Sequence, residues 1–163
     1  MRLLGGFAFS RKGARTFEIL RALWYNGGMI RFDERMPRER ARGLSPVVLA
    51  FVGDAAYSLY VRAALVFGTD HKTGMLQKLA SERVSAHGQA RLLQRAETLF
   101  TEEERAIFLR GRNAKKPTRS KHASVAEYNA STGLEAVIGF LYLVGDYARI
   151  AELLGGTGAE EMP

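Results

Sequence analysis

One long apolar segment, residues 44–68 (LSPVVLAFVGDAAYSLYVRAALVFG), constrains the fold of this chain more than any other. It predicts a single helix, because Ser45 suits the N-cap, Pro46 suits the first helical position and Gly68 can close the far end. Nearly every residue between these marks is apolar, so we expect the helix to be buried around most of its circumference. Asp54 nevertheless lies in its middle. A carboxylate in an apolar interior is costly unless it is paired, hydrogen-bonded or facing a cation, so this acid requires an explanation.

Size and composition indicate a single domain. With 163 residues, of which 47% are hydrophobic, the chain can bury one core and is too short for two ordinary domains. It has no cysteine, which excludes disulfides and thiolate metal sites and suits a reducing cytoplasm. The three histidines are scattered, so a zinc site is not expected. The longest uncharged apolar runs hold about ten residues, short of the ~20 that span a bilayer, so we expect no membrane-spanning segment.

The positive charge is concentrated in two parts of the chain. The net charge is +7, which suits a polyanionic partner. Residues 1–43 carry ten Arg or Lys against four acids, a net +6, which leaves only +1 for residues 44–163. Within this nearly neutral remainder, six basic residues fall in twelve positions without an acid: Arg110, Arg112, Lys115, Lys116, Arg119 and Lys121.

The predicted organisation is a helical core between two appendages. Residues 1–43 are a basic extension whose order the sequence does not define; residues 1–28 could be a basic arm, a transit-like segment or sequence upstream of a start at Met29. Residues 44–154 form the helical domain, and residues 155–163, rich in Gly and Glu, are expected to be disordered. We expect a cytoplasmic protein, or an organellar one if residues 1–28 are a genuine transit segment.

The remainder of the core also has helical patterns. Residues 69–100 predict two helices separated near residues 82–85. Thr101 and Ser124 each have a Glu three positions later, the spacing of a capping box that starts a helix. The helix that starts at Ser124 should end at Gly145 and be followed by one last short helix. No segment shows the alternation of a strand, so the predicted fold class is all-α.

A second isolated acid, Glu135, interrupts the apolar stretch STGLEAVIGFLYLV of residues 131–144. Either acid alone could be a hydrogen-bonded core residue or a charge on a helix surface. If their helices pack together, Asp54 and Glu135 could instead approach each other, and two such carboxylates repel unless a cation or a proton neutralises them. Magnesium suits the pair, because it binds through one or two carboxylates and keeps waters and substrate phosphate oxygens. Such a site would favour phosphodiester chemistry.

The basic residues after Gly111 predict an exposed loop, since residues 112–121 contain Pro117 and clustered polar residues. Charge runs are often simply solvated surface. In the functional interpretation four side chains contact phosphates: Arg112, Lys115, Lys116 and Lys121. Asn113 could reach a sugar or a base edge in the wide minor groove of A-form RNA.

Four sequence blocks, in this order and at suitable spacing, resemble the Mini-ribonuclease III family: LAFVGDAAYSLYVR, VSAHGQA, LFTEEERAIFLRGRNAK and YNASTGLEAVIGFLYL. These proteins are compact relatives of ribonuclease III that keep its helical catalytic domain and lack its double-stranded-RNA-binding domain. The resemblance covers about residues 44–154 and implies a ribonuclease III-like fold. It further implies a homodimeric, magnesium-dependent endoribonuclease cutting double-stranded RNA, in the family typically the stem of the precursor of large-subunit (23S) ribosomal RNA. A large-subunit ribosomal protein could act as a helper.

The resemblance also assigns roles to individual residues. Asp54 of the GDA motif matches the catalytic, metal-binding Asp, and Glu135 of the LEAVIG motif matches the metal-binding Glu. The implied reaction is hydrolysis by a metal-activated water, which leaves 5′-phosphate and 3′-hydroxyl ends. The stretch RGRNAK matches the family's RNA-facing element, so the expected RNA-binding residues are Arg110, Arg112, Asn113, Lys115, Lys116 and Lys121.

The chain departs from its relatives at several positions. Full-length ribonuclease III has acids where this chain has Val47, Ala50 and Thr132, a reduced set that the compact family shares. Ser58 and Ser124 replace acids that are common in relatives. The alternative function is therefore a non-catalytic double-stranded-RNA-binding or ribosome-associated module with the same fold. A helical DNA-binding protein is less favoured, because no helix-turn-helix pattern puts basic residues on a recognition helix.

Overall fold

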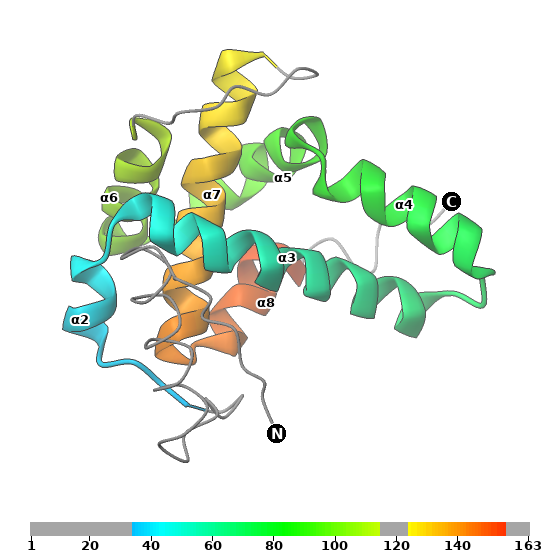
Figure 1. Cartoon of the computed structure of the whole chain (residues 1–163), viewed down its shortest axis with the longest axis horizontal. Helices are drawn as coiled ribbons and strands as arrows, with labels where there is room; N and C mark the ends of the chain where they lie inside the picture. The colour runs from blue at the N-terminus through cyan, green and yellow to red at the C-terminus, as the bar shows by residue number, and fades with distance from the viewer. Residues whose placement is uncertain (1–33, 115–123, 156–163) are drawn as a thin grey trace, which may run out of the picture. The chain divides into compact units, whose positions relative to one another are not determined.

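The computed structural model describes residues 34–114 and 124–155, and within them all regular secondary structure is helical, without a strand (Figure 1). The helices are α2 (Arg38–Gly43), α3 (Pro46–Gly68), α4 (Thr73–Val84), α5 (Ala86–Leu99), α6 (Glu102–Arg112), α7 (Val125–Val144) and α8 (Tyr147–Gly155). The predicted all-α class is confirmed. The extension up to residue 33 and the tail after residue 155 lie outside the described residues.

The compact unit begins at Arg35, earlier than the boundary expected at residue 44. Helix α2 packs against α7 and buries Ala41 completely. The amide of Met36 also donates to the carbonyl oxygen of Leu143 at 2.7 Å. Residues 35–43 are therefore part of the helical body.

Helices α6 and α7 begin at the two capping boxes predicted from the sequence. The Thr101 hydroxyl accepts from the amide of Glu104 at 3.3 Å, and the Glu104 carboxylate accepts from the amide of Thr101 at 2.8 Å. Ser124 and Glu127 make the same reciprocal pair at 3.2 and 3.0 Å. Helix α7 ends at Gly145, whose φ of 77° lies in the left-handed region that glycine adopts without strain. These boundaries depend on local residues alone.

Helix α7 is the central element, against which α2, α3, α5, α6 and α8 all pack (Figure 1). Its residues 131–141 are buried, except Glu135. Helix α3 crosses α7 at two glycines that bring the backbones into contact. A Cβ added to Gly53 would lie 1.8 Å from the carbonyl oxygen of Glu135, and one added to Gly139 would lie 2.0 Å from that of Leu49. The close crossing therefore requires glycine at both positions.

The structure corrects the expectation that α3 is buried on most sides. It buries one face, which includes Leu49, Tyr57 and Val61, while Phe51 and Phe67 are 81% and 92% exposed. Its neighbours in the described residues cover only part of its circumference.

The sequence predicted no membrane-spanning segment, but α3 is long and apolar enough to cross a bilayer. One such helix is weak evidence for a membrane span, since core helices of soluble proteins meet the same criterion.

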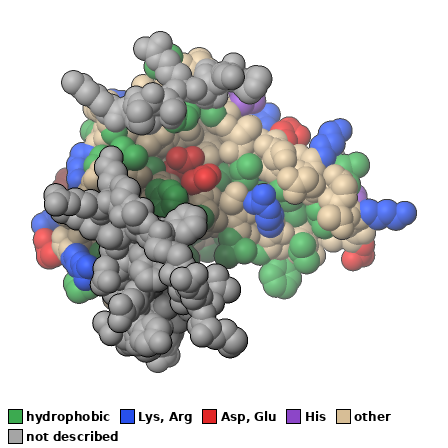
Figure 2. All heavy atoms as spheres, in the orientation of Figure 1, with side chains coloured by type: hydrophobic (Ala, Val, Ile, Leu, Met, Phe, Trp, Pro, Cys, Tyr) green, Lys and Arg blue, Asp and Glu red, His purple; other side chains and the backbone are tan. Residues whose placement is uncertain are grey.

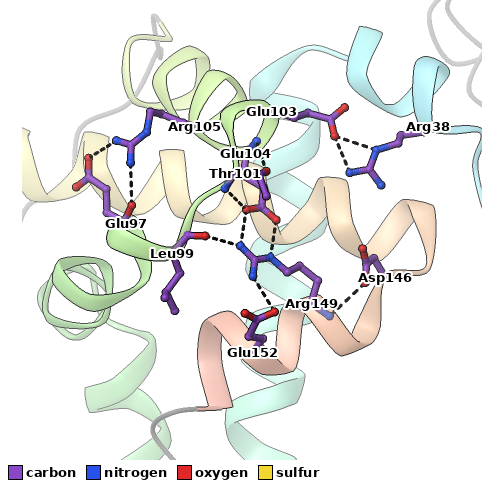
Figure 3. Close-up of polar contacts among 10 residues, drawn as sticks. All are labelled: Arg38, Glu97, Leu99, Thr101, Glu103, Glu104, Arg105, Asp146, Arg149 and Glu152. Carbon is purple, nitrogen blue, oxygen red and sulfur yellow. Dashed lines mark hydrogen bonds and ion pairs between the residues drawn. The ribbon is translucent and has the colours of Figure 1, made fainter.

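A buried ion pair ties α8 to the start of α6 (Figure 3). The Nε and Nη2 atoms of Arg149 donate to the two carboxylate oxygens of Glu104, each at 2.9 Å, and Nη2 also donates to the carbonyl of Leu99. Burial alone would raise the pKa of Glu104, but the hydrogen bonds from Arg149 and Thr101 outweigh it and hold the pKa below its usual value. Glu104 is therefore ionised at neutral pH although its side chain is only 2% exposed.

Candidate active site

The two isolated acids of the sequence both lie at the crossing of α3 and α7. Asp54 directly follows Gly53, which packs against the backbone of Glu135. Figure 2 shows acidic side chains gathered at the surface over the region where the two helices cross. Asp54 is the only acid of α3, and Glu127, the other acid of α7, lies in its first turn. The fold thus brings together two residues that lie far apart in the sequence.

The two carboxylates differ in environment. The side chain of Asp54 is exposed and has no hydrogen-bond or ion-pair partner within residues 34–114 and 124–155. Glu135 is partly buried, and its Oε1 accepts a hydrogen bond from Nε2 of Gln89 at 2.9 Å. In the same ranges no group of three or more His, Asp or Glu could hold a metal. A divalent ion here would take these two carboxylates and complete its coordination with water and substrate oxygens, the arrangement that Mg²⁺ prefers.

Gln89 is a third side chain of this site that the sequence did not single out. Its side chain is 2% exposed, and its Nε2 also donates to the carbonyl oxygen of Val84 at 3.2 Å. Its Oε1 is buried and has no hydrogen-bond partner in the described structure, which costs about 1–3 kcal/mol. Gln89 belongs to the block VSAHGQA, but no local pattern shows that its amide reaches a residue 46 positions away.

The two serines at positions where relatives often carry acids have partners of their own. The Ser58 hydroxyl accepts from Nη1 of Arg62 at 2.9 Å. The Ser124 hydroxyl donates to the carboxylate of Glu127 at 2.7 Å, and His87 contacts the other oxygen of that carboxylate at 3.1 Å. These hydrogen bonds, that from Ser124 first, lower the pKa of Glu127 to about 2. Both serines therefore act in local helix structure.

Arg110, expected among the RNA-binding residues, holds the junction between α2 and α3. Its guanidinium donates to the carbonyl oxygens of Arg42 and Leu44 at 2.8 and 2.7 Å. Both carbonyls lie at the end of α2, where no intrahelical donor is available. A contact between Arg110 and RNA stays a prediction.

The other expected RNA-binding residues lie at or beyond the end of α6. Arg112 places its guanidinium 5.8 Å from the ring centre of Phe108, and Asn113 is the C-cap. A Cβ added to Gly111 would lie 2.9 Å from Cα of Gly133, two residues before Glu135. The basic end of α6 therefore packs beside the acid-bearing part of α7. Three of the expected residues lie outside the described ranges: Lys115, Lys116 and Lys121.

A comparison with protein families defines the class. The profile of the Ribonuclease III domain matches residues 47–146, a span that includes Asp54, Gln89 and Glu135. Because the match covers more than half of the chain, the class of this protein is a ribonuclease III-type endoribonuclease.

Individual relatives narrow this class. Mini-ribonuclease 3 of Thermoanaerobacter sp. is 40% identical over 127 residues, which are 78% of this chain and 89% of that protein. Mini-ribonuclease 3 of Enterococcus faecalis is 42% identical over 113 residues, which are 68% of this chain and 86% of that protein. A crystal structure of a protein from Fusobacterium nucleatum matches with a TM-score of 0.62 at 30% identity, covering 70% of this chain and 91% of the other. The chain belongs to the Mini-ribonuclease III family, which confirms the resemblance seen in the sequence.

Proposed function

We propose that this protein is a magnesium-dependent endonuclease for double-stranded RNA, in which Asp54 and Glu135 are the catalytic and metal-binding residues. The observation that carries the proposal is the packing of Gly53 on the backbone of Glu135, because it puts both acids at one helix crossing. Family membership supports the reaction, since the relatives named above are ribonucleases. Two acids at one surface favour catalysis over a non-catalytic RNA-binding module with the same fold.

The donor set fits Mg²⁺, a hard ion that binds carboxylates and keeps several waters. When bound, the ion supplies positive charge at the scissile phosphate and makes water a better nucleophile. Asp54 contributes an exposed carboxylate without a protein partner in the described residues, so it is available to a cation. Glu135 contributes a carboxylate fixed by Gln89. Hydrolysis would leave a 5′-phosphate and a 3′-hydroxyl.

The basic segment that begins in α6 is the proposed RNA contact. Arg112 and Asn113 lie at the end of that helix, beside the α7 segment that carries Glu135. Phosphate contacts from these residues and from the lysines that follow, Lys115, Lys116 and Lys121, would hold a duplex over the acids. Such binding should weaken steeply as salt concentration rises.

We also propose a homodimer that forms through the exposed face of α3. This face is formed by apolar side chains of α3 that are 41–81% exposed: Val47, Val48, Phe51 and Leu59. Asp54 lies one turn from Phe51, at the edge of this surface. A second copy would cover the apolar face and place one active site on each strand of a duplex.

The proposed biological role is maturation of the precursor of 23S ribosomal RNA in the cytoplasm. This role rests on the family, as does assistance by a large-subunit ribosomal protein. A duplex made from the paired ends of that precursor is the natural substrate to compare with an unrelated duplex. Cleavage at one position of the precursor stem, against scattered cleavage of the other duplex, is the expected result.

Catalysis is tested with purified protein, a long RNA duplex and Mg²⁺, beside an Asp54→Asn variant. We expect the cleavage rate of the variant to fall by more than about 100-fold. Removing a residue that only hydrogen-bonds a metal ligand typically costs up to roughly 100-fold, and this variant removes a ligand itself. Asp70→Asn is the matched control, since Asp70 is exposed in the α3–α4 connection. Gel analysis of the products measures the rates.

Two outcomes contradict the proposal. Tight binding of the duplex without cutting by the parent would favour the non-catalytic module. Equal rates for the parent and Asp54→Asn would remove Asp54 from the active site.

A further inference from the structure

Gln89 lies where three helices meet. Helix α5 begins against the last turn of α4: the Ser85 hydroxyl accepts from the amide of Gly88 at 3.0 Å, and a Cβ on Gly88 would lie 2.5 Å from the carbonyl oxygens of Glu82 and Arg83. This tight turn fixes the backbone just before Gln89. Its side chain is thereby directed to the end of α4 and to Glu135 on α7.

The orientation of the Gln89 amide is determined by its two acceptors. A carboxamide NH₂ group has two hydrogens, and here both are directed to acceptors, the Val84 carbonyl and the Glu135 carboxylate. Exchanging the amide nitrogen and oxygen would put an oxygen against both acceptors, which is repulsive. The Oε1 atom is consequently fixed in a buried place without a partner in the described structure.

This arrangement destabilises the fold relative to a full set of hydrogen bonds, because a buried acceptor is left unpaired. An unbranched apolar side chain of similar volume would avoid that penalty. Gln89 provides two hydrogen bonds in return, one to the carbonyl oxygen of Val84 and one that fixes an oxygen of Glu135. Side chains that hold a metal-binding carboxylate in this way orient the ligand and affect metal affinity.

We propose that Gln89 is a positioning residue of the active site, whose amide holds the Glu135 carboxylate in the orientation that binds the divalent ion. This inference rests on the proposed function, because it takes Glu135 as a metal ligand. Among the described residues proposed to bind metal or RNA, Gln89 bonds only Glu135, so it should affect use of the metal and leave the affinity for RNA unchanged.

The test uses the full chain with Gln89→Met, which keeps the length of the side chain and removes the donor. We expect the dissociation constant for Mg²⁺, measured by calorimetry on the protein without RNA, to rise about 10- to 100-fold. The melting temperature should change by no more than about 4 °C. The variant loses two hydrogen bonds, which lowers stability, but it also removes the unpaired buried Oε1 atom, which raises stability. Affinity for an RNA duplex in EDTA should be unchanged. Gln94→Met is the matched control, an exposed glutamine on the same helix.

A second variant, Gln89→Asn, keeps the amide and shortens its reach by one methylene. Because the shortened amide no longer reaches Glu135, this variant should raise the Mg²⁺ dissociation constant as Gln89→Met does. The proposal can then be tested even if one of the two variants folds poorly. Parent-like Mg²⁺ affinity in both variants would overturn the proposal. Weaker Mg²⁺ and RNA binding that accompany a large fall in melting temperature would also overturn it, because the role of Gln89 would be structural. A parent that neither binds Mg²⁺ nor cuts duplex RNA would overturn the proposed function itself, which separates the two failures.

Discussion

At the residue scale, Arg149 and Glu104 form the most deeply buried charge pair among the described residues (Figure 3). Replacing Arg149 with Met leaves the Glu104 carboxylate buried without its cation. We expect the free energy of unfolding to fall by about 3–5 kcal/mol, the usual cost of breaking a buried pair on one side. Urea denaturation of the variant and the parent measures this difference.

Arg91→Met is the matched control, because Arg91 pairs with Glu82 at the surface at 3.5 Å. The free energy of unfolding of this variant should fall by at most about 1 kcal/mol, since exposed ion pairs contribute little to stability. A double variant, Arg149→Met with Glu104→Gln, should regain part of the stability because no charge is left buried. Similar losses for Arg91→Met and Arg149→Met would show that burial of the pair does not matter.

At the scale of elements, the crossing of α3 and α7 determines both packing and the position of the acids. In Gly139→Ala the new Cβ would lie 2.0 Å from the carbonyl oxygen of Leu49, so the helices must separate. Overpacking of this kind costs about 1–3 kcal/mol or more. Cleavage should also fall, because separation moves Asp54 away from Glu135. Thermal unfolding and the cleavage assay give the two readouts.

Gly74→Ala is the control for this prediction, because nothing lies within 4 Å of a Cβ at Gly74. In α4 the exchange should be neutral or stabilise by up to about 1 kcal/mol through helix propensity. Parent-like stability and cleavage in Gly139→Ala would show that close contact of the two backbones is not required.

At the scale of the whole molecule, the exposed apolar face of α3 predicts self-association. Leu59 is 63% exposed in the single chain and would be covered in the dimer. A carboxylate introduced at this position would then be buried without a partner, which disfavours the dimer. We expect the parent to sediment as a dimer at micromolar concentration and Leu59→Glu as a monomer of unchanged helical content. Sedimentation and circular dichroism measure these two properties.

Glu97→Gln is a control for a changed surface charge, since Glu97 lies on α5, while the helices that pack on α3 are mainly α4, α6 and α7. It should leave the dimer intact. A parent that sediments as a monomer and still cuts both strands efficiently would contradict the dimer.

Local sequence signals predicted the helix boundaries, because the interactions that define them span only a few residues. The capping boxes at Thr101 and Ser124 are complete within three positions, and Gly145 supplies its own left-handed backbone. The exposed side of α3 was not predictable in this way. Apolar residues all around a helix indicate burial, but which of them are covered depends on where the neighbouring helices lie.

The sequence by itself determined the helical class, the starts of α6 and α7 and the two acids that are anomalous in apolar surroundings, since each is a property of residue type and short spacing. Only the tertiary structure decided that Gly53 packs on Glu135, that Gln89 bonds Glu135 and that Arg110 caps α2. The physical reason is that these contacts join residues 46 to 82 positions apart, and such contacts form only when the packing of whole helices brings their backbones together.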